Sequence, residues 1–272
     1  MAARTLTDEQ VTIAGTTIPL RRGGQGRPLL FLNGGDGFHR SERWLGLLAG
    51  SYDVYAPKHP GYGGAPFAPH IRSVDELALF YLELLERFKL TDVVLVGASF
   101  GGWVATEVAV RSCDRLSCLA LIDSLGVKFG GPCDEDIADI YVLPPEEVKR
   151  RQYFDGRDRD FDYSSLSDEQ ATTIIRDREG EAYYGWKPYM HNPTLRHWLW
   201  RIRTPTVVLW GAGDGIVSPD YGRALAAEIE GSVFRTIERA GHYPHVENPE
   251  QVLHELNMFL SSRAASSGRP NQ

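Results

Sequence analysis

The stretch VVLVGASFGGWVA, residues 93–105, places a single serine, Ser99, between a run of apolar residues and a pair of glycines. The apolar run is typical of a buried strand of a parallel sheet, and the residues that follow Ser99 favour a helix. Residues 97–101, GASFG, fit the pattern G-x-S-x-G, in which the serine stands at a sharp turn from strand to helix. A glycine-rich helix start with no catalytic role would have the same sequence pattern, so the interpretation needs support from the rest of the chain.

The alternation of strand and helix continues on both sides of this stretch. Apolar runs such as PLLFLNGG (28–35) and LSCLALID (116–123) read as further buried strands. Residues 73–90 have leucines at helical spacing, and Ser73 with Glu76 fits a capping box at the start of that helix. We therefore predict an α/β fold with a mostly parallel central sheet flanked by helices.

This rhythm is interrupted between about residues 125 and 203. The segment is rich in charge, tyrosine, tryptophan and proline, and it contains three stretches that favour short helices. It is longer than an ordinary connection. We predict a core formed by residues 1–124 and 204–263, a helical cap at 125–203 and a flexible tail at 264–272.

Composition narrows the classes of partner. The chain has 272 residues and a net charge of −7, which argues against nucleic acid, and its apolar runs are too short to span a membrane. The first ten residues lack the apolar core of a secretory signal. The three cysteines have no CxxC spacing, which predicts neither a disulfide framework nor a zinc site and favours the cytoplasm. Whether the chain forms a homo-oligomer stays open.

A serine nucleophile needs a base, and the base needs an acid to orient it. Asp214 follows a buried strand in the loop GAGDG, and His242 lies in the loop before the last helix. The order Ser99, Asp214, His242 matches that of hydrolases with the G-x-S-x-G turn. Asp123, at the end of the strand before the insertion, is an alternative acid, although we prefer Asp214. His242 and His245 have H-x-x-H spacing but lack a third ligand, so we expect no metal.

Taken together, the serine turn, the acid loop and the AGH loop followed by VENPEQV resemble the α/β-hydrolase fold family, of the type with a cap inserted after the sixth strand. The resemblance covers about residues 9–262. It implies a serine hydrolase that forms a covalent intermediate with a small carbonyl compound and uses neither a metal nor a cofactor.

The resemblance also implies an oxyanion hole made of two backbone N–H groups. One belongs to Phe100, and the other comes from the loop NGGDG, where Gly35 is the best candidate and Gly34 and Asp36 are alternatives. Family members often carry His-Gly where this chain has Asn33 and Gly34. The backbone donors survive this change, but any anchoring of the loop by that histidine is lost.

Contacts with the substrate are the least defined part of the site. Most aromatic residues of the insertion should pack the cap on the core, while a minority should line an apolar pocket, which favours an apolar or aromatic small molecule. Trp186 and Trp198, together with Gly34, are the candidates for substrate contact. His39 and His59 lie in loops near the expected mouth, and we expect both to be exposed. The aromatic group is Tyr183, Tyr184, Trp186, Tyr189, Trp198 and Trp200.

The leading functional hypothesis is hydrolysis of an ester, lactone or thioester. An alternative within the family is carbon–carbon bond hydrolysis of a vinylogous diketone, because the stretch from Asn192 to Leu195 and the segment SLGVKFGG resemble such enzymes. Those enzymes tend to carry tryptophan where this chain has Tyr243. A hypothesis of another class is a ligand receptor on the same fold, in which the three residues serve binding or a single turnover.

Overall fold

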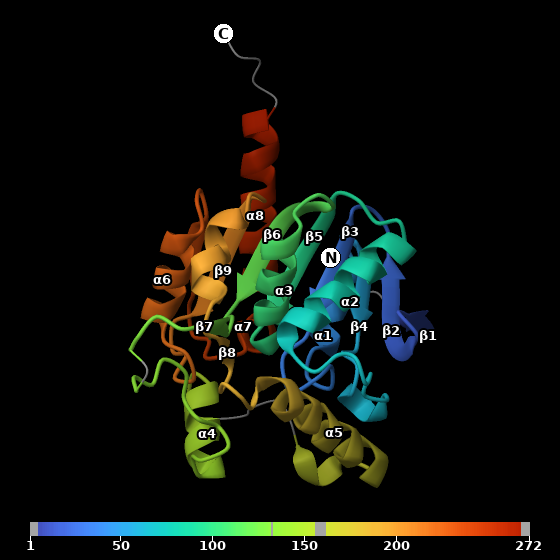
Figure 1. The fold of residues 1–272 in the computed structure, drawn as a ribbon, viewed down its shortest axis with the longest axis vertical. Coiled ribbons are helices and arrows are strands. Elements are labelled where there is room, and N and C mark those ends of the chain that lie inside the picture. Colours follow the sequence, from blue (N-terminus) through green and yellow to red (C-terminus); the bar gives the residue numbers. More distant parts are fainter. Residues whose placement is uncertain (1–4, 132, 156–161, 268–272) are drawn as a thin grey trace.

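An eight-stranded sheet forms the centre of the computed structural model, which describes residues 5–131, 133–155 and 162–267 (Figure 1). The first two strands form an antiparallel hairpin, the second also runs antiparallel to β4, and all other neighbours are parallel, which confirms the predicted sheet. In spatial order the strands are β1 (Thr7–Ile13), β2 (Thr16–Gly24), β4 (Asp53–Pro57), β3 (Pro28–Leu32), β5 (Val93–Ala98), β6 (Leu116–Ile122), β9 (Thr206–Gly211) and β10 (Val233–Ile237).

Helices cover both faces of this sheet (Figure 1). One apolar cluster joins a face of the sheet to α2, α3 and α6, and a second joins the opposite face to α1 and α8. The bounds of these helices are α1 (Glu42–Ala49), α2 (Val74–Arg87), α3 (Phe100–Arg111), α6 (Pro219–Glu228) and α8 (Pro249–Ser267).

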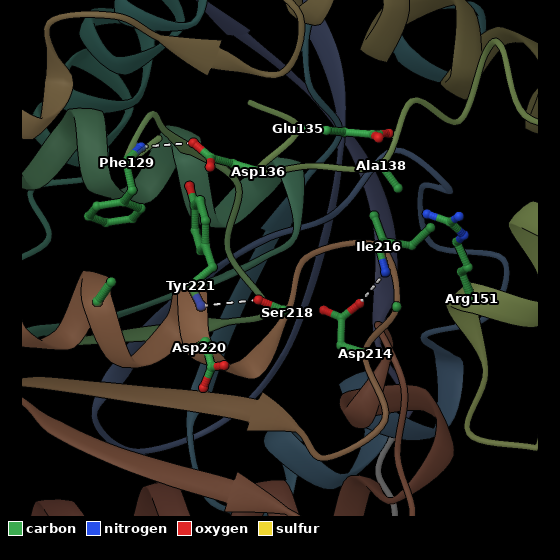
Figure 2. Close-up of a pocket in the computed structure, with 12 residues that line it drawn as sticks. Phe129, Glu135, Asp136, Ala138, Arg151, Asp214, Ile216, Ser218, Asp220 and Tyr221 are labelled. Atoms are coloured by element: carbon green, nitrogen blue, oxygen red, sulfur yellow. Dashed lines mark hydrogen bonds between the residues drawn. The ribbon is translucent and has the colours of Figure 1, made fainter. Parts of the chain in front are cut away.

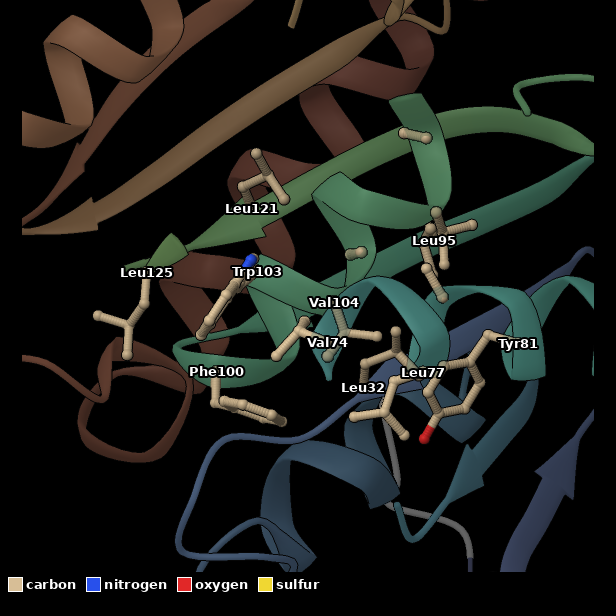
Figure 3. Close-up of a cluster of buried hydrophobic side chains, with 14 of the residues drawn as sticks. Leu32, Val74, Leu77, Tyr81, Leu95, Phe100, Trp103, Val104, Leu121 and Leu125 are labelled. Carbon is tan, nitrogen blue, oxygen red and sulfur yellow. The ribbon is translucent and has the colours of Figure 1, made fainter. Parts of the chain in front are cut away.

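Strand β5 shows how the apolar sequence satisfies both faces. Val93 and Leu95 belong to the cluster under α2 and α3, whereas Val94 and Val96 belong to the cluster on the other face. Successive side chains of a strand point to opposite faces, so an uninterrupted apolar run is required where both faces are covered. Figure 3 draws Leu95 in the same buried cluster as Val104 of α3 and Leu77 of α2.

The insertion between β6 and β9 contains more than helices. Its helix α5 lies with α4 at one end of the sheet, beyond the flanking helices (Figure 1). Leu195 and Leu199, in the last of its helices, are fully buried in the apolar cluster of the core, so this end of the insertion packs against α3. The elements are β7 (Gly126–Val127), α4 (Pro145–Gln152), η2 (Tyr163–Ser165), α5 (Asp168–Gly185), β8 (His191–Asn192), which pairs with β7, and η3 (Leu195–Arg201).

Two expected helix ends differ from the structure. The side chain of Ser73 makes no capping hydrogen bond, and Glu76 instead accepts a hydrogen bond from the backbone N–H of Arg72 at 2.6 Å. Helix α8 continues to Ser267, so residues 264–267, which we expected to begin a flexible tail, are helical. The rest of that tail, residues 268–272, lies outside the described residues.

Close approach between elements explains the glycines around Ser99. A Cβ on Gly101 would overlap the backbone carbonyl of Leu32 in β3, and one on Gly97 would overlap the backbone of Gly101. A Cβ on Gly102 would come within 2.6 Å of the Ser124 side chain. Helix α3 can therefore start directly against the sheet only because these positions lack side chains.

Substitution of Gly101 by alanine should destabilise the fold by about 3 kcal/mol, because backbone atoms rather than a flexible side chain occupy the space. Urea unfolding followed by circular dichroism measures this change. Gly131→Ala is the matched control, since Gly131 is exposed and the nearest atom to its added Cβ lies at 3.3 Å, and it should change stability by less than about 0.5 kcal/mol. Equal stabilities of the two variants would contradict this account of the turn.

Candidate active site

Ser99 occupies the turn between β5 and α3, as predicted. Its backbone has φ of 51° and ψ of −119°, a conformation that side chains with a Cβ seldom adopt. The Ser99 N–H donates to the carbonyl oxygen of Ile122 in β6 at 2.8 Å, which ties the turn to the neighbouring strand. The side chain is thereby raised above the carboxyl end of the sheet, next to the N-terminus of α3.

The structure brings the three sequence-predicted residues into one hydrogen-bonded chain. The Oγ of Ser99 lies 2.8 Å from Nε2 of His242, and Nδ1 of His242 lies 2.8 Å from Oδ2 of Asp214. All three side chains are buried. With Nδ1–H donating to the carboxylate, Nε2 carries a lone pair that can accept the serine proton.

The loop after β9 fixes the orientation of Asp214. Its Oδ1 accepts hydrogen bonds from the backbone N–H groups of Ile216 at 2.8 Å and Val217 at 3.1 Å, while Oδ2 is left for the imidazole. Figure 2 shows the Ile216 bond at the edge of a pocket of about 390 Å³, which lies beside this loop and is also lined by Tyr221 of α6. The acid is thus held by its own backbone loop.

Asp123, the alternative acid, lies beside Asp214 without reaching the imidazole. Its Oδ1 accepts from the backbone N–H of Gly211 at 3.0 Å, and the side chain is fully buried. Burial and the adjacent Asp214 charge raise the pKa of Asp123 well above its usual range. Asp123, Asp214 and His242 lie close enough to suggest a metal site, but both nitrogens of His242 are already engaged.

The two aspartates should respond differently to replacement by asparagine. If Asp214 orients the imidazole, Asp214→Asn should lower kcat/KM by about 10³-fold or more, because the amide cannot replace the carboxylate. Asp123→Asn keeps the oxygen that accepts from the Gly211 N–H and removes no contact to the imidazole, so it should retain activity within about tenfold. Kinetics with an activated ester and unfolding curves of both variants measure this. The opposite ranking would identify Asp123 as the acid.

Gly34, in the loop after β3, lies directly against the serine. A Cβ on Gly34 would be 3.1 Å from the Ser99 Cβ and 3.7 Å from its Oγ. Phe100, whose N–H is the other predicted oxyanion donor, is the first residue of α3, and the first N–H groups of a helix have no partner within it. The loop and the helix start therefore flank Ser99 from two sides, with Gly35 one residue further along the loop.

His59, which we expected to be exposed, is fully buried and anchors this loop. Burial lowers the pKa of His59 to about 4, so its ring is neutral. Its Nε2 lies 3.0 Å from the carbonyl oxygen of Asn33 and its Nδ1 lies 2.5 Å from the hydroxyl of Tyr81, so the ring donates to the loop and accepts from α2. The anchoring that Asn33 cannot supply thus comes from a histidine after β4. His39 is half-buried rather than exposed.

The proposed cap tryptophans do not lie in this buried region. Trp186 is 63% exposed and Trp198 is 49% exposed, so neither lines an enclosed pocket. Tyr184 of the same aromatic group is buried and donates its hydroxyl proton to the carbonyl oxygen of Pro60 at 3.1 Å. Tyr184 therefore packs the insertion against the core.

Sequence reasoning missed Glu181, which α5 carries into the loop region. Its side chain is 6% exposed, and a Cβ on Gly35 would overlap the carboxylate. Burial, the largest cause, and the nearby Asp36 charge raise the pKa of Glu181 to about 7. The only sequence signal was the spacing of Asp177, Gly180, Glu181 and Tyr184 along one face of α5, and an acidic face of that kind usually points to solvent.

Because the pKa of Glu181 is raised, the contribution of Glu181 to the free energy of unfolding should depend on pH. The folded state binds the Glu181 proton more tightly than the unfolded state, so this contribution to stability is lost as pH rises from about 4.5 to about 7. When pH rises from about 5 to about 8, the free energy of unfolding of Glu181→Gln should increase by about 2 kcal/mol relative to that of the wild type. Urea unfolding at both pH values tests this, with exposed Glu179→Gln as the control. A pH-independent difference would refute it.

Residues 29–255 match the sequence profile of the family described as the alpha/beta hydrolase family. The chain belongs to this family. The predicted hydrolase fold is thereby confirmed at the level of the family, and the relatives and neighbours with named activities are hydrolases.

Three similar proteins illustrate the range of activities among alpha/beta hydrolases. The 2-hydroxymuconate semialdehyde hydrolase of Pseudomonas sp. (strain CF600) is 23% identical, over 95% of each chain. The pimeloyl-acyl-carrier-protein methyl ester esterase of Chromobacterium violaceum is 25% identical, over 89% of this chain and 97% of that one. The structure of a putative lipase from Acinetobacter baumannii AYE superposes with a TM-score of 0.75 at 20% identity, covering 96% and 93% of the two chains.

No helix among the described residues is both long and apolar enough to cross a membrane.

Proposed function

We propose that the protein is a serine hydrolase that cleaves an ester, lactone or thioester of a small molecule. The observation that carries this proposal is the unbroken chain of hydrogen bonds from Ser99 through His242 to Asp214, both links being 2.8 Å long. A serine hydroxyl is a poor nucleophile by itself, and this arrangement supplies the base and the orienting acid that it lacks.

In the proposed reaction, Ser99 Oγ attacks the carbonyl carbon while His242 Nε2 accepts the hydroxyl proton. Asp214 stabilises the resulting imidazolium, and His242 then donates the proton to the leaving group. The developing negative charge on the carbonyl oxygen is assigned to the N–H groups of Phe100 and Gly35. Water, activated by His242, releases the acyl group and restores the serine.

Hydrolysis of a carbon–carbon bond is the second candidate, supported by the similarity to the 2-hydroxymuconate semialdehyde hydrolase. The structure gives the motif that suggested it another explanation. Asn192 Nδ2 donates to Glu107 Oε1 of α3 at 2.8 Å, and its Oδ1 accepts from the N–H of Thr194, so Asn192 shapes a turn and fixes it to the core. We therefore rank ester-type substrates first.

As part of the same proposal we assign the protein to the cytoplasm and its substrate to small molecules. The described cysteines, Cys113, Cys118 and Cys133, are unpaired, which fits a reducing compartment.

Replacement of Ser99 by alanine tests the proposal. The wild type should release p-nitrophenol from a short p-nitrophenyl ester over many turnovers and react with a fluorophosphonate probe. Ser99→Ala should abolish labelling and lower kcat/KM by about 10⁴-fold or more. Ser124→Ala removes another buried serine and should still be labelled. Activity of Ser99→Ala within tenfold of the wild type would disprove the assignment, and a single stoichiometric burst would favour a receptor.

A further inference from the structure

Two buried polar groups beside the proposed nucleophile have no partner among the residues that the structure describes. The hydroxyl of Tyr62, in the 3-10 helix η1 (Tyr62–Gly64), makes no hydrogen bond although the side chain is completely buried. The carboxylate of Glu181 is 6% exposed rather than fully enclosed, and it forms no hydrogen bond or ion pair within the described ranges. Buried polar groups are almost always satisfied, so two such groups in one region indicate a place where a polar group of a ligand can bind.

We infer that Glu181 and Tyr62 form a polar subsite that binds a hydrogen-bond-donating group of the substrate, an ammonium or hydroxyl group, close to the scissile carbonyl. This inference rests on the proposed function, because it uses Ser99 as the point of attack. It concerns selection of the substrate rather than the bond-breaking step.

The loop after β3 places this subsite next to Ser99. Gly34 lies against the Ser99 side chain, and the following residue, Gly35, lies against the Glu181 carboxylate. Consecutive Cα atoms are about 3.8 Å apart, so a small substrate can contact both groups at once. A carbonyl held at the Gly35 N–H would thus bring its neighbouring substituent toward Glu181.

Tyr62 belongs to the same subsite. A Cβ on Gly180, the residue before Glu181, would overlap the Tyr62 ring, so α5 rests on η1 at this point. The ring stacks on Phe100 with centroids 6.1 Å apart, which ties it to the start of α3. Burial and then the charge of Glu181 raise the pKa of the Tyr62 hydroxyl well above its usual range, which agrees with their proximity. A neutral hydroxyl can both donate to and accept from a ligand.

The charges around Glu181 select the sign of the ligand. Lys58 Nζ pairs with Asp177 at 3.3 Å, and Arg178 lies 3.6 Å from Asp36, so both other carboxylates of this region have a cation beside them. Glu181 has none. An ammonium group would complete the charge balance, a hydroxyl would supply a hydrogen bond, and a carboxylate would be repelled.

The position of Glu181 also argues against a purely structural role. A buried ionisable group without a partner destabilises the folded state, and glutamine of the same shape would avoid that cost. Ionisable groups perturbed by burial cluster at functional sites.

Four p-nitrophenyl esters with the same acyl chain length test the inference: butyrate, β-hydroxybutyrate, β-aminobutyrate and the succinate half-ester. The wild type should prefer the amino or hydroxy ester over butyrate by about tenfold in kcat/KM and disfavour the succinate ester. In Glu181→Gln, the ratio of kcat/KM for the amino ester to that for butyrate should fall at least about tenfold. In Glu181→Met, the ratios for the amino ester and for the hydroxy ester should both fall by this factor. Tyr62→Phe should weaken it. Glu179→Gln, an exposed position on the same helix, should leave the ratios unchanged.

The comparison of ratios separates this inference from the proposed function. Hydrolysis that depends on Ser99 but shows equal ratios in the wild type and Glu181→Gln overturns the subsite and leaves the hydrolase intact. If no ester is cleaved, binding decides: titration calorimetry should show tighter binding of β-aminobutyramide than of butyramide by the wild type and not by Glu181→Gln. Equal affinities of the wild type for the two amides would overturn the subsite.

Discussion

Ser99 holds a backbone conformation with positive φ that is unfavourable for any residue with a Cβ, and the surrounding structure has to enforce it. Enforcement comes from β6, whose Ile122 carbonyl accepts the Ser99 N–H, and from glycines that let α3 start against β3. This turn decides where the hydroxyl stands, and the positions of the imidazole and the oxyanion loop are useful only relative to it.

The residues grouped around Ser99 lie in separate loops at the carboxyl end of the sheet. Asp214 follows β9, His242 follows β10, and Gly34 follows β3, so parallel strands deliver all of them to the same end. His59 and Tyr81 then hold the loop of Asn33 from beneath. The insertion contributes from the other side, since α5 brings Asp177 to Lys58 and Glu181 to Gly35.

The sequence predicted those features that depend on local pattern. Apolar runs identified the strands, and the order of Ser99, Asp214 and His242 identified the hydrogen-bonded chain because strand ends in such sheets converge. Features that depend on side-chain direction escaped it. His59 looked like an exposed loop histidine, Glu181 looked like one acid among many on a polar helix, and Trp186 and Trp198 looked like pocket residues although they face solvent. Spacing alone cannot show which face of an inserted helix meets the core.

Glu181 has a consequence for how the insertion and the sheet stay together. Its proton affinity depends on being enclosed between α5 and Gly35, so any displacement of α5 that admits water lets the carboxylic acid ionise. At neutral pH, where a group with a pKa of about 7 is about half protonated, separation of the two parts would release about half a proton on average to the solvent. Alkaline conditions would then favour the separated arrangement and acidic conditions the closed one, which makes the contact between α5 and the β3 loop a proton-linked equilibrium.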